Sequence, residues 1–111
     1  MPQGQPAKLL QVRISETDRH QGKPLYQAIV ARCREMRIAG VTVFRGLEGY
    51  GETTEMHRAH LLRHDQPIVV VTADAAEKIS TLLPALEELL DTGTIAVSDL
   101  TAIRVNKNGR T

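Results

Sequence analysis

Apolar and polar residues alternate in the first part of the chain, and this alternation predicts a β-strand. Within residues 9–15 every second position is apolar, namely Leu10, Val12 and Ile14. A period of two over this length is typical of a strand with one buried face. The preceding residues 1–8 contain two prolines and a glycine and lack an apolar pattern, so we expect a disordered N-terminal tail there.

The apolar period becomes helical after Pro24. Proline suits the first turn of a helix because no intrahelical partner needs its missing N–H. Gly40 suits the end of the helix, since glycine adopts the left-handed conformation at little cost. We therefore predict a helix from Pro24 to about Gly40, with Cys33 as an inert thiol on its buried face. The apolar positions at helical spacing are Leu25, Ala28, Ile29, Cys33 and Met36.

Two further strands are predicted at residues 41–45 and 68–71. The second consists of four consecutive β-branched residues, Ile68-Val69-Val70-Val71. A strand that is apolar at consecutive positions is covered on both faces. Two helices can cover only one face of a four-stranded sheet, so we expect another subunit to cover the other face.

A second helix and a last strand complete the pattern. Asp74 and Glu77 resemble a capping box at the start of the helix. Pro84 lies inside the helix and should kink or split it, because it removes the bond to the carbonyl of Ser80. Gly93 should end the helix, and weak alternation over residues 100–105 predicts the last strand.

The predicted order of elements is βαββαβ, which is the order of the ferredoxin-like fold. We therefore expect an α+β sandwich, with a four-stranded antiparallel sheet and two helices on one of its faces. Residues 9–106 would form this single domain, and residues 107–111 a C-terminal tail. A length of 111 residues agrees with one domain.

Composition narrows the classes of partner. The formal net charge is +1 with acidic and basic residues interspersed, so we expect neither nucleic acid nor an anionic membrane surface as a partner. One cysteine excludes an intramolecular disulfide. No apolar run approaches the ~20 residues of a membrane span, so we expect no membrane insertion. A cytoplasmic location is the default expectation.

A glycine-rich segment follows the strand at 41–45. Gly46, Gly49 and Gly51 leave backbone N–H groups unobstructed, and such groups can surround a phosphate or another anion. The spacing matches neither a Walker loop nor a dinucleotide-binding fingerprint. The alternative is a turn whose glycines serve only positive φ angles.

Three histidines, His57, His60 and His64, are the second candidate site. Their i, i+3, i+7 spacing would place them on one face of a helix, where three imidazoles could bind zinc or copper. The alternative is a polar surface loop with solvated histidines, since no group to orient the rings is evident. No set of serine, cysteine, histidine or carboxylate residues indicates a catalytic site, and we expect the protein not to be an enzyme.

Several of these segments resemble a known family. The segments 22–30 and 39–51, together with Pro67-Ile-Val-Val-Val71, Glu77-Lys-Ile79 and Leu83-Pro84, are similar to the PII-like family known as domain of unknown function 190. The resemblance covers residues 9–105 almost entirely. It also accounts for Pro84, since a Leu-Pro pair is typical of this helix in the family.

The resemblance implies a homotrimeric signalling protein with a small effector bound between subunits. By analogy with PII proteins, Gly49-Tyr50-Gly51 would be the root of a mobile T-loop over residues 52–66. The loop would dock on a target protein, for which a membrane transporter or channel is the candidate. The effector would be an adenine nucleotide or another small anion, with a divalent metal at the histidines as the alternative. The expected ligand-binding residues are Arg45, Gly46, Gly49, Tyr50, Gly51, Glu52 and Arg104.

One part of the PII pattern is missing. Thr92-Gly-Thr-Ile95 resembles the segment that precedes the PII phosphate-binding loop, but residues 96–100 contain neither its glycine pair nor its lysine. A bound nucleotide would therefore need cations from elsewhere, for which Arg45, Arg104, Lys107 and Arg110 are the candidates.

Overall fold

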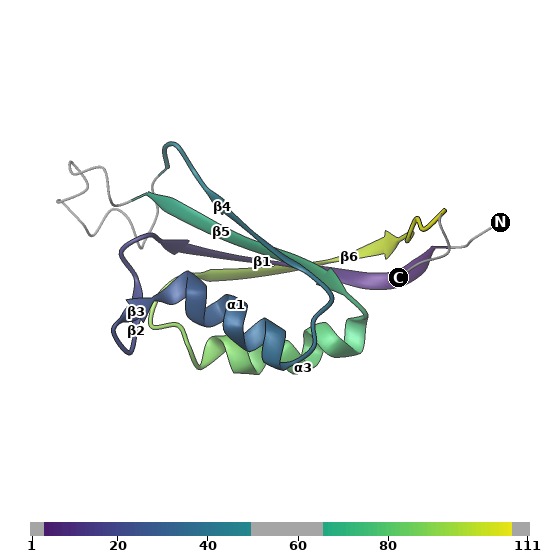
Figure 1. Ribbon diagram of the computed structural model, residues 1–111, viewed down its shortest axis with the longest axis horizontal. Coiled ribbons are helices and arrows are strands. Elements are labelled where there is room, and N and C mark those ends of the chain that lie inside the picture. Colours follow the sequence, from purple (N-terminus) through teal and green to yellow (C-terminus); the bar gives the residue numbers. More distant parts are fainter. Residues whose placement is uncertain (1–3, 50–65, 108–111) are drawn as a thin grey trace.

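The computed structural model describes residues 4–49 and 66–107, and these form a four-stranded sheet with two helices on one face (Figure 1). The strand order is β4-β5-β1-β6, and every neighbouring pair is antiparallel. Without the short β2–β3 hairpin, the chain order is βαββαβ. The predicted ferredoxin-like α+β fold is thus confirmed. Its elements are β1 (Gln5–Ser15), β2 (Arg19–His20), β3 (Lys23–Pro24), α1 (Leu25–Glu35), β4 (Val41–Arg45), β5 (Pro67–Asp74), α3 (Ala76–Glu87) and β6 (Thr94–Ala102).

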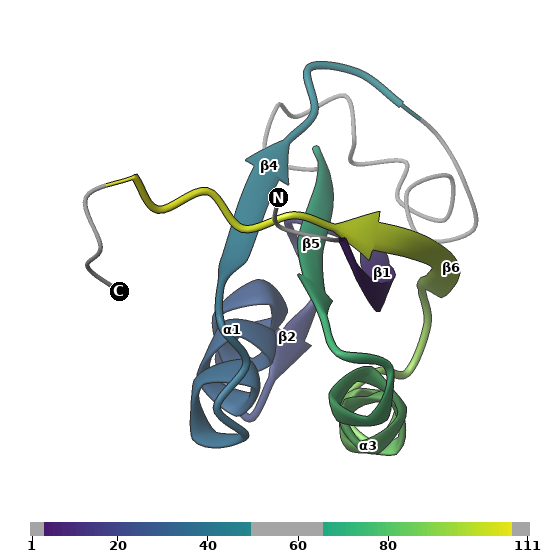
Figure 2. The same cartoon turned by 90° about the vertical axis from the view of Figure 1, so that its right-hand side faces the viewer.

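The core lies between the sheet and the two helices. Alternate residues of the two central strands point toward the helices, as the period of two requires. In the views along the sheet, α1 and α3 lie side by side beneath it (Figure 2). The core has no aromatic residue among its fully buried side chains, the largest of which are Leu10, Ile29, Ile68, Ile79, Leu82, Leu86, Val12, Val70 and Cys33.

The opposite face of the sheet, which we call the open face, carries several apolar side chains and is not covered by any described helix. Val69 and Val71 alternate with the buried Ile68 and Val70, so their side chains point to the open face, where they are half-buried. Phe44 pairs with Val69 on the same face and is 55% exposed. We predicted that the strand at 68–71 is covered on both of its faces. Within the described chain only the face toward the helices is covered.

Two strand boundaries differ from the prediction. β1 begins at Gln5, so residues 5–8 belong to a strand and not to a disordered tail. β6 spans Thr94–Ala102, and the prediction of a strand over 100–105 is wrong. Both errors have one cause. The two strands pair with each other from Gln5↔Ala102 to Arg13↔Thr94, but Gln5, Pro6 and most side chains of β6 are exposed, so no apolar period marks these segments.

An ion pair joins these two outer strand segments. Lys8 Nζ lies 2.6 Å from Asp99 Oδ1. The hydrogen bond and the charge of Lys8 lower the pKa of the Asp99 carboxyl. The contact is exposed to solvent, so we assign it a minor role in stability.

The end of α1 also differs from the prediction. Met36 is the C-cap, and Arg37 takes the left-handed conformation with φ 61°. The N–H of Arg37 donates to the Arg34 carbonyl and that of Ile38 to the Cys33 carbonyl, which is the Schellman pattern. The helix therefore ends before Gly40. The side chain of Ile38 packs against the core, and Arg37 rather than a glycine takes the left-handed position of this turn.

α3 begins without the predicted capping box. Its N-cap is Ala75, and no side chain caps the helix. Asp74 instead accepts hydrogen bonds from the N–H groups of Ala75 (2.7 Å) and Ala39 (3.0 Å), which ties the start of α3 to the segment before β4. Pro84 lies within a helix that continues to Glu87. Neither of the helices in the described residues has the length and apolar character needed to cross a membrane.

We expect the thiol of Cys33 to be protected in the folded protein. Cys33 is 1% exposed, and burial raises the pKa of its thiol, so both access and thiolate formation are suppressed. A maleimide reagent should react at least about a hundredfold more slowly with the native chain than with the denatured chain. Because Cys33 is the only cysteine, mass spectrometry gives one unambiguous adduct. Rapid labelling under native conditions would contradict this packing.

Candidate functional site

The base of the 46–66 loop is closed by two backbone hydrogen bonds. The N–H of Gly46 donates to the Pro67 carbonyl at 2.7 Å, and the N–H of Glu16 donates to the Gln66 carbonyl at 2.8 Å. The first bond continues the β4–β5 pairing, and the second ties the loop to the end of β1. The described ends of the loop are therefore held by the sheet.

Gly46 and Gly49 serve close packing at this base. A Cβ atom on Gly46 would lie 2.7 Å from Pro67 Cγ, and one on Gly49 would lie 3.2 Å from the same atom. Neither glycine has a positive φ, so the turn interpretation, which assigned the glycines to positive φ angles, is wrong at both positions. The backbone N–H groups of these glycines are not all available to bind an anion, because that of Gly46 donates to the Pro67 carbonyl. Tyr50, Gly51 and Glu52 lie outside the described residues.

Arg45 stands at the end of β4, beside the loop base. One of its terminal nitrogens, Nη2, lies 2.9 Å from Glu16 Oε2, and its side chain is half exposed. The pair links the ends of β4 and β1 next to the two backbone bonds. An anion that binds Arg45 would have to share its guanidinium group with Glu16; the remaining donors of this group make no contact to a polar partner within residues 4–49 and 66–107.

The Thr92–Ile95 segment lies at the same end of the sheet as the loop base. Gly93 has φ 132°, and a Cβ there would lie 3.0 Å from the Arg13 carbonyl oxygen, so a glycine is required. A hollow of about 320 Å³ opens beside it. Its lining includes Glu87 and Asp91 but no lysine or arginine. A phosphate group would therefore find no compensating charge in this hollow.

Arg104 lies far from Arg45 within one chain. Arg45 shares its row of the sheet with Ile14, whereas Ala102 pairs with Gln5, nine residues away along β1. At about 3.3 Å per residue this separates the two ends by about 30 Å. The segment 103–107 then runs away from the sheet (Figure 2), with Ile103 and Val105 exposed. The predicted ligand-binding arginines are thus not brought together in a single chain.

The sequence analysis missed Arg13 as a candidate. Arg13 lies on the open face in one row with Phe44, Val69 and Thr94. Within residues 4–49 and 66–107 its side chain makes no hydrogen bond or ion pair. A charge on an apolar face needs a partner once that face is covered. The alternation in residues 9–15 placed Arg13 on the outward side, but only the sheet shows that the apolar side chains of Phe44 and Val69 lie next to it.

The predicted histidine site cannot be located, because His57, His60 and His64 lie outside the described residues. In the described part of the chain, no group of three or more histidine, cysteine or carboxylate side chains is arranged to hold a metal ion.

Comparison with known proteins identifies the family. The profile of domain of unknown function 190, described as "Uncharacterized ACR", matches residues 7–102. The chain belongs to this family. A relative from Aquifex aeolicus, named UPF0166 protein, is 39% identical over 82 residues, which are 72% of this chain and 78% of that protein. The predicted family membership is confirmed.

Solved structures with a similar fold are PII-like. CPII from Thiomonas intermedia K12, bound to ADP and bicarbonate, aligns with a TM-score of 0.69 over 94% of this chain and 95% of that chain, at 19% identity. The same protein bound to ADP, AMP and acetate gives a TM-score of 0.68 over 91% of this chain and 92% of that chain, at 18% identity. At this level of identity the likeness establishes a shared PII-like, ferredoxin-like fold.

The glycines at the loop base should be unequally sensitive to substitution. We expect Gly46→Ala to lower the free energy of unfolding by about 1–3 kcal/mol, since the new methyl group would overlap the Pro67 ring. Gly49→Ala should cost less, because its contact is longer. Urea denaturation of each variant measures both effects.

Gly40→Ala is the matched control. A Cβ at Gly40 meets no atom within 4 Å and its φ is not positive, so alanine should be neutral or stabilising by up to about 1 kcal/mol. Equal destabilisation at positions 40 and 46 would contradict the role assigned to the Gly46–Pro67 contact.

Proposed function

We propose that this protein is a non-enzymatic PII-like regulator that assembles as a homotrimer and binds an adenine nucleotide between its subunits. The observation that carries the proposal is the separation of about 30 Å along β1 between the row of Arg45 and the row of Ala102, after which the chain continues to Arg104. One chain cannot bring both arginines to one ligand. Two neighbouring chains can, if the loop base of one copy meets the C-terminal end of the next.

The open face supports an assembly through the sheet. Phe44, Val69 and Val71 form an apolar surface on the side away from the helices. Covering it with a second and third copy would bury apolar area without disturbing the core. Arg13 would then lie inside the assembly, where a ligand anion or a carboxylate of another copy would have to neutralise it.

The choice of an adenine nucleotide as the ligand rests on the shared fold and on the positions of the arginine side chains. CPII, which shares the fold, binds ADP together with bicarbonate. In the chain described here, the hollow at Thr92–Ile95 contains no lysine or arginine, so the phosphates would depend on Arg45 of one copy and Arg104 of another. Because Glu16 already pairs with Arg45, ligand binding would change the loop base directly. The 52–66 loop would transmit this change to a target protein.

The oligomeric state is the first test. Light scattering should give a mass of about 37 kDa, three times the 12.3 kDa chain. Val71→Asp should reduce it to a monomer of native secondary structure, because a carboxylate would be placed in the covered face. Val97→Asp is the control, since Val97 is 41% exposed and pairs with Leu10 on the helix side. A monomeric wild type, or dissociation by both variants alike, would contradict the assembly.

Subunit complementation tests the shared nucleotide site. Arg45→Gln and Arg104→Gln should each abolish ADP binding in isothermal titration, because each removes a phosphate contact. Refolding an equal mixture of the two variants should restore about a quarter of the sites, since that fraction of interfaces pairs an intact Arg45 with an intact Arg104.

Arg19→Gln serves as the control, because Arg19 is an exposed cation on the β2–β3 hairpin and is not one of the two proposed phosphate ligands. It should bind ADP as the wild type does. If the mixed trimers bind no ADP while the wild type does, the two arginines do not share a site. If the wild type itself does not bind ADP, AMP or ATP, with or without bicarbonate, the nucleotide proposal fails.

A further inference from the structure

A second hollow lies on the helix side of the molecule, away from the open face and the loop base. It has a volume of about 460 Å³, which is within the range of ligand pockets of roughly 300–1,000 Å³. The β2–β3 hairpin forms one wall and α1 another, and Leu89, two residues after the end of α3, contributes a third side. The lining residues are His20, Gln21, Lys23, Gln27, Ala28, Ala31, Arg32, Glu35 and Leu89.

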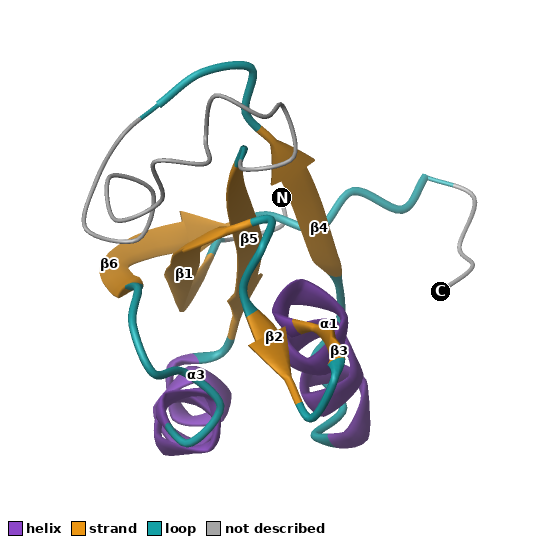
Figure 3. Cartoon of the chain, turned by 90° about the vertical axis from the view of Figure 1, so that its left-hand side faces the viewer, coloured by secondary structure: helices purple, strands orange, loops and turns teal. Residues whose placement is uncertain are grey.

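The hairpin has the geometry needed to present its side chains to this hollow. His20 and Lys23 are cross-strand partners, joined by the two-residue turn Gln21–Gly22. Both turn residues have positive φ, 51° and 82°, as in the tight turns that fit the twist of a β-hairpin. Figure 3 shows the hairpin beside α1, on the side toward α3. His20 and Lys23 therefore stand together at one edge of the hollow.

The hollow exists because α1 presents small residues there. Ala28 and Ala31 leave space that a larger side chain would fill, and the buried Leu89 provides an apolar contact surface. Gln27 adds an amide at the start of α1, whose first turn is not capped by any side chain. The result is a mixed surface, apolar on one side and polar or basic on the other.

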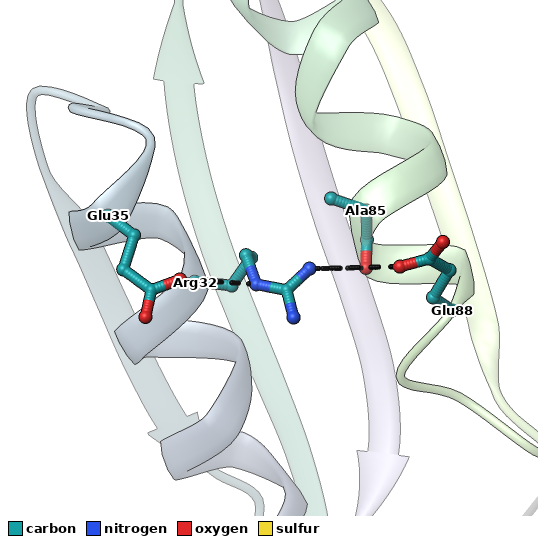
Figure 4. A network of polar contacts seen from close by, with 4 residues as sticks. All are labelled: Arg32, Glu35, Ala85 and Glu88. Atoms are coloured by element: carbon teal, nitrogen blue, oxygen red, sulfur yellow. Dashed lines mark hydrogen bonds and ion pairs between the residues drawn. The ribbon is translucent and has the colours of Figure 1, made fainter.

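Arg32 is fixed in position on the other side of the hollow (Figure 4). Its Nε lies 3.3 Å from Glu35 Oε1, and its Nη1 lies 3.5 Å from the Ala85 carbonyl oxygen and 3.9 Å from Glu88 Oε1. These contacts hold the guanidinium between the two helices and use Nε and Nη1. The donors on Nη2 have no partner in the described chain and remain available for a ligand.

His20 and Lys23 are likewise without polar partners. In residues 4–49 and 66–107 neither side chain makes a hydrogen bond or an ion pair. Three basic side chains, from β2, β3 and α1, thus line one hollow, and the only carboxylate in its lining, that of Glu35, is engaged with Arg32. This arrangement favours an anionic group against His20 and Lys23.

We infer that this hollow, which we call the hairpin pocket, binds a small organic anion that carries a carboxylate or a phosphate. The anionic group contacts His20, Lys23 and the free edge of Arg32, and the carbon skeleton lies against Ala28, Ala31 and Leu89. The pocket lies within a single chain and on the covered side of the sheet, so its occupancy does not depend on assembly through the open face.

Amide chemical shifts of the ¹⁵N-labelled protein test the pocket directly. The probes are citrate, malate, glutamate, glycerol 3-phosphate and inorganic phosphate, each to about 10 mM. At least one should shift the amides of residues 19–23 and 27–35 in a saturable manner. The set of active probes distinguishes a carboxylate from a phosphate ligand, and inorganic phosphate reveals whether the carbon skeleton contributes.

Two variants establish where the active probe binds. The double variant His20→Gln/Lys23→Gln should weaken binding by about tenfold or more, as expected for the loss of charge-assisted hydrogen bonds. Ala31→Trp should abolish it by filling the pocket. Arg19→Gln removes an equal charge from the same hairpin outside the lining and should leave the affinity within about twofold of wild type.

The results separate this inference from the proposed function. Val71→Asp should retain the hairpin-pocket shifts even where it loses ADP binding. Four outcomes would overturn the inference: no probe shifts these amides, binding survives Ala31→Trp in a folded chain, the double variant keeps full affinity, or Arg19→Gln weakens binding as much as the double variant. The last outcome would mean that only the general charge of the hairpin attracts the probe.

Discussion

The structure depends on the two-sided pairing of β1 at the centre of the sheet. β1 pairs with β5 from Lys8 to Ser15 and with β6 from Gln5 to Arg13. Its alternate residues Leu10, Val12 and Ile14 are at most 2% exposed beneath the helices. A shift of this register by one residue would turn the apolar set to the open face and Arg13 into the core. The placement of every other element follows from this one strand.

The same pairing decides where the candidate ligand residues stand. The end of β1 meets the loop base through Glu16, which pairs with Arg45 and bonds to Gln66. The start of β1 meets the C-terminal end of β6, which carries Arg104 away from that base. A long central strand therefore separates residues that the family resemblance groups together. In the proposed assembly, contact between two copies of the chain would bring Arg45 of one copy close to Arg104 of the other.

The molecule presents two surfaces of different character. The open face carries apolar side chains beside Arg13, whose side chain makes no hydrogen bond or ion pair within the described residues, and the apolar part suits burial against other copies. The helix side carries a basic hollow within one chain, and contacts to α1 and to residues 85–88 hold Arg32 at one side of it. Assembly and small-molecule binding at the hairpin pocket can therefore vary independently. A regulator with both would respond to two signals on opposite sides of one sheet.

Much of the fold was accessible from apolar periodicity. The βαββαβ order, the strand at 41–45 and the alternation of Ile68–Val71 between two faces were predicted, because each segment carries its own pattern of buried positions. The ends of β1 and β6 were not, because their pairing is made by backbone groups whose side chains remain exposed. The capping box at Asp74 failed because that carboxylate bonds to Ala39, a residue far away in the sequence.

The candidate site was predicted less completely, for a related reason. Gly46 and Gly49 were singled out from the sequence as ligand-binding or turn residues, but their packing against Pro67 became visible only across the β4–β5 pair. Arg13 and the hairpin pocket were missed, since neither has a motif. The sequence alone determined which residues are apolar, in what period, and to which family the chain is related. The tertiary structure alone decided which distant residues meet, because those contacts depend on strand register and helix packing rather than on any local pattern.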